Sequence, residues 1–335
     1  MVTERRTFPP TACTWPSARV AATSAREVPI TPLLPWLVFD RADWSKLRAD
    51  TPLTLSDADI DALRGLNAPL SLDEVEAVYL PLTRLLNLRF KGVEALRAAT
   101  HSFLGSHSTP MPFVIGLAGS VAVGKSTFAR VLQAILGAWK DHPRVEIVAT
   151  DGFLRPNADL ERRGILGRKG FPESYDRGAL PSFLTELKSG AERVTCPVYS
   201  HRDYDIVPGE QIVVERPDIL IVEGLNVLQS GMGTAFVSDF FDFSIYLDAD
   251  TADLRRWYVE RFRRLRDTGF RDAGSYFHRY ASLSDAEADA RANEIWSTIN
   301  EVNLLQNILP TRDRATLIVT KGSDHRVSEV RLRKL

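Results

Sequence analysis

Residues 113–139 read FVIGLAGSVAVGKSTFARVLQAILGAW, and this stretch decides the fold. Its centre matches the pattern G-x-x-x-x-G-K-[ST] at every required position, from Gly119 to Ser126. The apolar run before the motif, 113–117, has the length of a strand that is buried on both faces. Apolar residues after the motif recur at helical spacing and share one face: Phe128, Val131, Leu132, Ile135 and Trp139. A strand, a glycine-rich loop and a helix in this order predict a site for a nucleotide triphosphate.

The chemistry of this loop explains the spacing of its residues. Two glycines let the backbone curl so that its N–H groups point at a polyphosphate, and the positive end of the following helix adds to the attraction. Lys125 can reach the β and γ phosphates, and the Ser126 hydroxyl can hold Mg²⁺. A chance glycine turn would not require both flanking elements, and both are present here. The predicted nucleotide-binding residues are Gly119, Ser120, Val121, Ala122, Val123, Gly124, Lys125, Ser126 and Thr127.

Short apolar runs, separated by helical stretches, extend from this loop to the end of the chain. The candidate strands are 113–117, 145–149, 219–222, 243–247 and 317–319. Near-continuous apolar runs of this length are typical of a parallel sheet that helices cover on both faces. We therefore predict an α/β fold of the P-loop NTPase type, with a mostly parallel, doubly wound sheet. A late helix begins at the Ser284 and Glu287 pair, and Pro310 ends it.

The first third of the chain, from about residue 31 to 110, reads as helical. Ser56 with Asp59, and Ser71 with Glu74, have the spacing of helix starts at which both side chains accept backbone hydrogen bonds. Pro81 predicts a kink in the helix that follows the second start.

The domain organisation follows from these two regions. We expect one domain, 38–335, in which a helical layer, 38–110, is added to an α/β core, 113–335. Residues 1–37 combine prolines and arginines without an apolar core and are expected to form a flexible extension.

The whole chain has an almost balanced charge, with 42 lysines and arginines against 43 acidic residues among 335 residues. This balance argues against a surface that is basic enough to coat nucleic acid. No run approaches the roughly 20 apolar residues that span a bilayer, and residues 1–30 lack the apolar segment of a signal peptide. The two cysteines, Cys13 and Cys196, do not make a disulfide framework. We expect a soluble, cytoplasmic protein with no nucleic-acid or membrane partner.

Two carboxylates directly follow predicted strands, at the edge of a parallel sheet where ligands gather. Asp151 follows 145–149 and can accept the proton of an acceptor hydroxyl as a γ-phosphoryl group moves; a turn aspartate is the alternative. Glu223 follows 219–222 and is placed to position Mg²⁺, with a helix-capping carboxylate as the alternative. A GTPase is disfavoured because 320–324, TKGSD, misses the base-reading motif by one residue, and no D-x-x-G follows the strand at Glu223.

Basic and aromatic residues suggest where the other substrate binds. Arginines are concentrated in 255–266 and again in 162–169, and we expect most of them on the surface with one or two that clamp a phosphoryl group. Tyr199, His201 and Tyr204 place three hydrogen-bonding rings within six residues, which favours a pocket for a small polar molecule over an isolated structural histidine. Asn300 lies with Trp296 on the late helix, where the spacing favours core packing.

Several segments together resemble bacterial type I pantothenate kinase, in order and with few gaps over about 38–335. The segments that carry the resemblance are GSVAVGKST at 119–127, TDGF at 150–153, KGFPESY at 169–175, PVYSH at 197–201, DILIVEGLNVL at 218–228, NILPTR at 307–312 and VRLRK at 330–334.

This resemblance implies a single kinase domain that phosphorylates the primary hydroxyl of pantothenate with ATP, in the first step towards coenzyme A. By similarity, Asp151 is the base, Lys125 binds the phosphates, and Arg261 neutralises the transferred phosphoryl group. The implied pantothenate pocket comprises Tyr199, His201, Tyr204, Tyr258, Arg261, Phe262 and Asn300. The family's feedback site for coenzyme A overlaps the ATP site, with matches at Lys125, Arg130 and His201 and, near the adenine, at Asn67 and His325. The resemblance also implies a homodimer.

The sequence departs from the family pattern in two places, and two alternative functions stay open. Residues 1–37 match nothing in the family, and Arg202-Asp203 replaces a pair that usually begins with an apolar residue, which bears on pocket shape and feedback strength. A P-loop kinase for another hydroxyl, such as uridine, glycerate or a sugar phosphate, is the first alternative. An ATP-binding regulator is the second, although a regulator would not need Asp151 beside an acceptor pocket.

Overall fold

The computed structural model describes residues 35–65, 70–106, 110–229 and 236–334. Pro35–Leu335 make up one compact unit. The expected extension, 1–37, therefore lies outside the described residues except for its last three. Within the described part of the chain, no helix is both long and apolar enough to cross a membrane.

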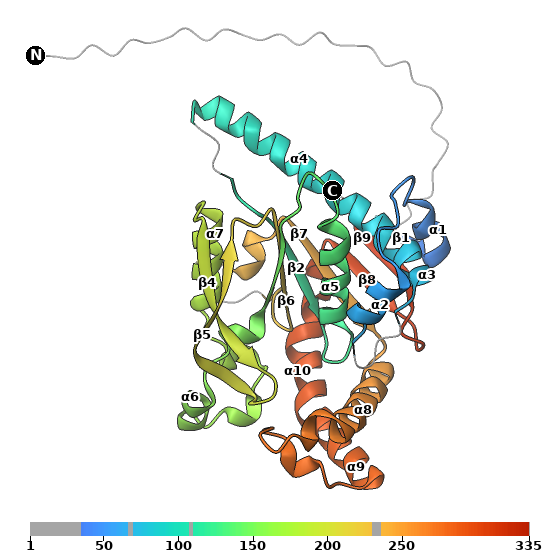
Figure 1. Ribbon diagram of the computed structural model, residues 1–335, viewed down its shortest axis with the longest axis vertical. Helices are drawn as coiled ribbons and strands as arrows, with labels where there is room; N and C mark the ends of the chain where they lie inside the picture. The colour runs from blue at the N-terminus through green and yellow to red at the C-terminus, as the bar shows by residue number, and fades with distance from the viewer. Residues whose placement is uncertain (1–34, 66–69, 107–109, 230–235, 335) are drawn as a thin grey trace, which may run out of the picture. The chain divides into compact units, whose positions relative to one another are not determined.

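A seven-stranded sheet forms the centre of this unit, in the order β1-β9-β8-β7-β2-β6-β3 (Figure 1). The strands β3, β6, β2, β7 and β8 are all parallel, whereas β9 and β1 add an antiparallel pair at the other side of the sheet. The bounds of the seven strands are β1 Trp36–Asp40, β2 Phe113–Gly119, β3 Val145–Ala149, β6 Ile219–Gly224, β7 Phe243–Ala249, β8 Leu317–Lys321 and β9 Val327–Arg333. All five predicted strands are confirmed, and four of them run two residues further than the apolar pattern indicated.

Helices cover the sheet and a small ribbon stands apart from it. The α-helices are α1 Arg41–Lys46, α2 Asp57–Leu63, α3 Leu72–Glu74, α4 Leu80–Leu104, α5 Lys125–Leu136, α6 Asn157–Arg162, α7 Ala179–Lys188, α8 Thr251–Asp267, α9 Asp285–Ile295 and α10 Glu301–Asn303. The ribbon consists of β4, Arg193–Ser200, paired antiparallel with β5, Asp205–Glu215. Helix α5 packs on β2, β3 and β6, so the helix that follows the phosphate loop covers the side of the sheet that ends at β3.

The predicted helical layer is confirmed for α1 to α4 but is wrong for its first residues. Trp36–Asp40 form a strand that pairs with β9, and only at Arg41 does a helix begin, with the Asp40 side chain as its N-cap. Strands β1 and β9 were hard to predict because both are half-exposed and pair with each other across almost 300 residues of sequence.

The structure contains the predicted helix starts, and the turn of helix before Pro81 is π-helical. Ser56 with Asp59 and Ser284 with Glu287 form complete capping boxes. A π-helical segment, Val75–Tyr79, precedes Pro81, so the helix accommodates the proline by widening the turn before it. The late helix begins at Asp285, passes through two π segments and ends at Ile308, next to the turn that holds Pro310.

Candidate active site

The phosphate loop connects β2 to α5 through residues whose backbone is left-handed or close to it. Gly119 ends β2 with φ +148°, and a Cβ there would lie 2.7 Å from the carbonyl oxygen of Leu247, so no side chain fits. Ala122 has φ 65°, and Gly124, with φ 94°, is the N-cap of α5. The loop thus presents the N-terminal end of a twelve-residue helix, which is the arrangement that binds phosphate groups.

Lys125 is the first residue of this helix, and its Nζ donates to the carbonyl oxygen of Ser120 at 2.8 Å. Burial lowers the pKa of Lys125 to about 8, against the attraction of Glu223 and Asp151, which raises it. A lysine in this environment gains most from an anionic partner, because a phosphate would replace the solvation that burial removes. The sheet therefore brings both predicted carboxylates within electrostatic reach of Lys125.

Glu223 lies in β6, where the register pairs it with Leu117 of β2 and with Ala149 of β3. Its carboxylate accepts a hydrogen bond from the Ser126 hydroxyl at 3.1 Å. Burial raises the pKa of Glu223, whereas Lys125 and Ser126 lower it. Among the described residues no group of three His, Cys, Asp or Glu side chains could hold a metal ion. A hydroxyl next to a single carboxylate fits Mg²⁺, which keeps most of its ligands as water and phosphate oxygens.

Asp151 lies in the short 3-10 turn, Thr150–Phe153, that follows β3. Its charge raises the pKa values of Lys125 and Glu223 on the phosphate-loop side and those of Lys169 and Tyr199 on the other side. Asp151 is therefore within electrostatic reach of both sets of groups. The half-buried position of Asp151 leaves it able to meet a substrate.

The ribbon is fixed closely against this turn. A Cβ on Gly152 would lie 2.5 Å from the carbonyl oxygen of Pro197 in β4, so the glycine permits the two backbones to touch. The rings of Tyr199 and His201 meet edge to face at 5.2 Å between centroids, and Tyr204 lies 6.5 Å from Tyr199. The three predicted rings therefore come together on the ribbon, beside Asp151.

Lys169 is the residue of this pocket whose position the sequence did not reveal. Its place in the basic segment 162–169 predicts a surface position, yet only 8% of Lys169 is exposed. Its Nζ lies 4.2 Å from the ring centroid of Tyr204 and 5.0 Å from that of Tyr199, and it donates to Asn157 Oδ1 at 2.6 Å and to the carbonyl oxygen of Tyr204. Burial lowers its pKa to about 8, while Asp205 and Asp151 raise it. The sequence signal was its place in the KGFPESY segment rather than its charge.

Helix α8 and the late helix bring further predicted residues to the same region. Burial raises the pKa of Tyr258, whereas the neighbouring Asn300 side chain lowers it. Arg261, one turn along α8, lowers the pKa values of both Tyr258 and Lys125. Arg261 is thus within electrostatic reach of both the phosphate loop and Tyr258, as a phosphoryl clamp requires.

Phe262 has a different environment from its neighbours on α8. It is 5% exposed and packs at 5.5 Å, between ring centroids, against both Phe270 and Tyr280 in a separate apolar cluster. Phe262 thus packs within this apolar cluster, whereas the resemblance implied only a place in the pantothenate pocket. Other arginines of α8 make exposed ion pairs with neighbouring acids, as in Arg263 with Asp289, which fits the expectation of a mostly solvated charged face.

The predicted coenzyme A residues lie in several places. Arg130 projects from α5 and donates to the carbonyl oxygen of Leu63 at 3.1 Å. His325 lies in the turn between β8 and β9, where its ring stacks on Trp257 at 4.0 Å between centroids. Burial lowers the pKa of His325 to about 4, and Lys321 adds to this decrease. Asn67 lies outside the described residues.

Arg202, the residue at the unusual position after His201, joins two loops. Its guanidinium meets the Asp272 carboxylate twice, at 2.7 and 3.1 Å, and its carbonyl oxygen accepts from the Tyr276 N–H at 2.9 Å. The Tyr276 ring in turn lies 5.1 Å from that of Tyr204. The exposed ion pair thus holds the loop 272–276 against the ribbon at the aromatic pocket.

Comparison with known proteins identifies the family. The model of the phosphoribulokinase / uridine kinase family matches residues 114–284. A pantothenate kinase of Rhodococcus jostii is 56% identical over 303 residues, which are 90% of this chain and 97% of the relative. Pantothenate kinases of Rhodopseudomonas palustris and Corynebacterium glutamicum are 57% and 55% identical, covering 90% and 94% of this chain and 96% and 98% of theirs. The chain therefore belongs to the pantothenate kinase family, a branch of the phosphoribulokinase and uridine kinase group of P-loop kinases.

Proposed function

We propose that this protein transfers the γ-phosphoryl group of ATP to the primary hydroxyl of pantothenate, giving 4'-phosphopantothenate in the first step towards coenzyme A. The observation that carries the proposal is the position of Asp151, whose charge acts both on Lys125 of the phosphate loop and on Lys169 beneath the aromatic rings. The family and the names of its members, at 55–57% identity, supply the identity of the acceptor.

The proposed reaction assigns one task to each charged residue. Asp151 takes the proton of the acceptor hydroxyl as its oxygen bonds to the γ-phosphorus, while the bond from that phosphorus to the β–γ bridging oxygen breaks and ADP leaves. Lys125 and Arg261 balance the charge on the transferred group. Ser126 and Glu223 would hold Mg²⁺, which supplies additional positive charge at the phosphates when bound.

The proposed acceptor pocket is formed by the aromatic rings of the ribbon, by Tyr258 of α8 and by Asn300 of the late helix. Tyr199, His201 and Tyr204 line one side, and Tyr258 with Asn300 offers hydrogen bonds on the other. Arg261 borders this pocket as well as the phosphate loop, and Phe262 supports it from the apolar cluster behind.

Feedback inhibition by coenzyme A is proposed for the same nucleotide site. Lys125, Arg130 and His201, with His325 and Asn67 near the adenine, would hold the inhibitor, so that coenzyme A competes with ATP. We also propose that the protein acts in the cytoplasm, because ATP and coenzyme A, its proposed substrate and inhibitor, are present there.

The experiment that tests this function is ADP release with a panel of acceptors. We expect turnover with pantothenate and background release with uridine, with glycerate or with no acceptor. Activity with uridine but not with pantothenate would contradict the proposal. In the same assay coenzyme A should raise the KM for ATP and leave kcat unchanged; inhibition that excess ATP does not relieve would argue against a shared site.

A prediction about the pocket follows from Arg202. We expect Arg202→Leu to raise the KM for pantothenate by roughly two- to fivefold, because an exposed ion pair contributes about 0.2–1 kcal/mol. The KM for ATP should not change. Arg216→Leu is the matched control, since Arg216 pairs with Glu192 at the far end of the same ribbon. Equal changes for Arg202→Leu and Arg216→Leu would contradict a role for the loop contact.

Helix α4 supports the proposal of a homodimer. Beyond its second turn it exposes Leu88, Leu96 and Phe103, the last with 88% of its surface exposed. Gly92 and Ala99 lie on the same face by helical spacing and allow a second helix to approach closely. Figure 1 shows this part of α4 extending past the sheet. A second copy of the chain, contributing the same helix, is the proposed occupant of this face.

Light scattering after size exclusion tests the dimer. We expect the wild-type chain at twice the monomer mass, and the double variant Leu96→Glu with Phe103→Glu at the monomer mass, because two buried carboxylates would oppose association. Lys91→Glu is the control, because Lys91 lies on another face of α4 and pairs with Asp141. A wild-type monomer, or a double variant that stays dimeric, would contradict this interface.

A further inference from the structure

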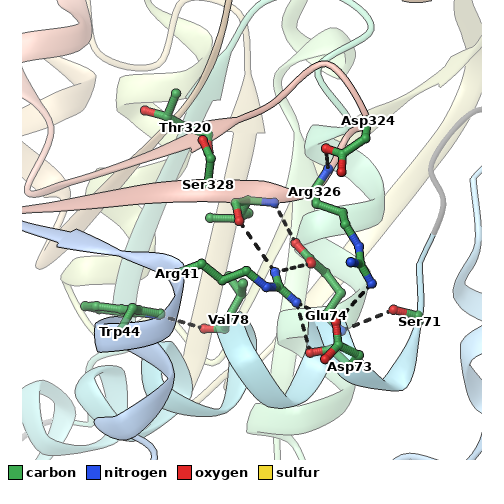
Figure 2. Close-up of polar contacts among 11 residues, drawn as sticks. Arg41, Trp44, Ser71, Asp73, Glu74, Val78, Thr320, Asp324, Arg326 and Ser328 are labelled. Carbon is green, nitrogen blue, oxygen red and sulfur yellow. Dashed lines mark hydrogen bonds and ion pairs between the residues drawn. The ribbon is translucent and has the colours of Figure 1, made fainter.

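Glu74 does not act as the sequence indicated. Ser71 accepts the Glu74 N–H at 3.2 Å, as a helix cap does. The Glu74 carboxylate, however, leaves the helix start and accepts the N–H of Val327 at 2.9 Å through Oε1, and it pairs with Arg41 through Oε2 (Figure 2). Glu74 is 5% exposed. The Glu74 carboxylate therefore joins separate elements of the fold instead of capping its own helix, and loss of a buried charge partner of this kind is strongly destabilising.

A network of charges holds the β8–β9 turn to the first helices, with Glu74 at its centre. Arg41 also contacts Asp73 at 2.8 Å, and Asp73 in turn pairs with Arg326 at 3.0 Å. These contacts are drawn together in Figure 2. Residues from α1, from α3 and from the first residues after the turn thus converge, although they are far apart in sequence.

The strand opposite Val327 carries the residue that reaches the phosphate loop. Lys321 is the register partner of Val327, at a β-bulge that follows Thr320. The bulge directs Lys321 inward, where 9% of it is exposed, and its Nζ donates to the carbonyl oxygen of Val123 at 2.9 Å. Val123 is the phosphate-loop residue directly before Gly124.

Glu74 and Lys321 also influence each other through charge. Burial lowers the pKa of Lys321 to about 8, and the Glu74 carboxylate raises it. A buried ammonium group needs such a counter-charge to stay protonated, and only the protonated form donates strongly to a carbonyl. The contacts thus form a continuous path from Glu74, through Val327 and Lys321, to the phosphate loop.

We propose that Glu74 and Lys321 are positioning residues for the phosphate loop: Glu74 fixes the β8–β9 turn through Arg41 and the Val327 N–H, and Lys321 fixes the carbonyl of Val123. The backbone N–H groups that bind the nucleotide then start from the correct geometry, which lowers the ordering cost of binding. The acceptor pocket on the ribbon shares none of these contacts. The pair therefore sets affinity for the nucleotide and not for the acceptor.

The test separates the two substrates. Glu74→Gln keeps the shape of the side chain but removes its charge, and we expect the KM for ATP to rise roughly fivefold or more, since hydrogen bonds to charged groups are among the stronger ones. The KM for pantothenate should stay within twofold of wild type. The Kd for a non-hydrolysable ATP analogue, measured by calorimetry, should rise with the KM. The control is Glu76→Gln, because Glu76 lies two residues away and makes an exposed pair with Arg48 at 2.7 Å.

A double-mutant cycle completes the test. We expect Lys321→Met to weaken ATP binding, and the double variant with Glu74→Gln to bind ATP no worse than Lys321→Met alone, because both act through one contact. Additive effects would overturn the proposal, as would an ATP KM for Glu74→Gln within twofold of wild type, or equal increases for both substrates. Should Lys321→Met fail to fold, the comparison of Glu74→Gln with Glu76→Gln decides alone.

Discussion

Asp151→Asn is expected to lower kcat by roughly 10²- to 10⁴-fold, the range that positioned general bases contribute. The amide has the shape of the carboxylate and can still accept a hydrogen bond from the acceptor hydroxyl, but it cannot take the proton. The KM values for ATP and pantothenate should therefore change little. The control is Asp176→Asn, because Asp176 is a nearby exposed residue whose Oδ1 accepts from the Gly178 N–H.

Direct binding measurements separate this loss from misfolding. The Kd of Asp151→Asn for an ATP analogue should lie within about threefold of wild type, since Asp151 is repulsive rather than attractive towards phosphate. Removal of its negative charge also takes an attractive partner away from Lys125, which partly offsets that gain. Equal loss of turnover and of nucleotide binding would contradict the assignment of Asp151 as the base.

Lys125→Ala is expected to cause the other large loss, here in kcat and in ATP affinity together. The side chain is buried within the influence of Glu223 and Asp151, so its removal takes a cation away from two carboxylates in a site that must accept a polyphosphate. We expect kcat/KM for ATP to fall by roughly 10³-fold or more, as seen when groups that stabilise developing charge are removed. Steady-state kinetics at saturating pantothenate measures this change.

The neighbouring cation provides the comparison for Lys125. Lys169→Met should raise the KM for pantothenate and lower kcat, yet leave the Kd for an ATP analogue close to wild type, because its contacts are Tyr199, Tyr204 and Asn157. Should both lysine variants lose ATP affinity by the same factor, the division of the site into a phosphate side and an acceptor side would be wrong.

The parts of the fold that the sequence predicted are those whose signals are local. The five parallel strands carry runs of mostly apolar residues, and the phosphate loop needs glycines and a lysine at fixed spacing, so both could be predicted directly. The strands β1 and β9 could not be, because they are half-exposed and their pairing joins opposite ends of the chain. The Ser71 and Glu74 pair matched a capping box by spacing, but the Glu74 carboxylate has a stronger partner in Arg41 and the N–H of Val327, which only the tertiary fold supplies.

The candidate site shows the same division. Asp151 and Glu223 could be placed at the end of the sheet because parallel strands end at a common edge. Lys169 could not, since its burial depends on the ribbon and on rings 30 and 35 residues away in sequence. Tyr258, Arg261 and Asn300 were identified through the family resemblance, and their spacing alone favoured core packing or a solvated helix face.

The identity of the phosphorylated product tests the central claim most directly. Incubation with ATP and pantothenate, followed by phosphorus and proton NMR, should give one new phosphate ester whose phosphorus couples to the methylene protons of the primary alcohol, with one ADP formed for each ester. The opposite result would be ADP release without a pantothenate ester, or an ester on the secondary hydroxyl. Either one would contradict a site in which Asp151 takes the proton of the primary hydroxyl.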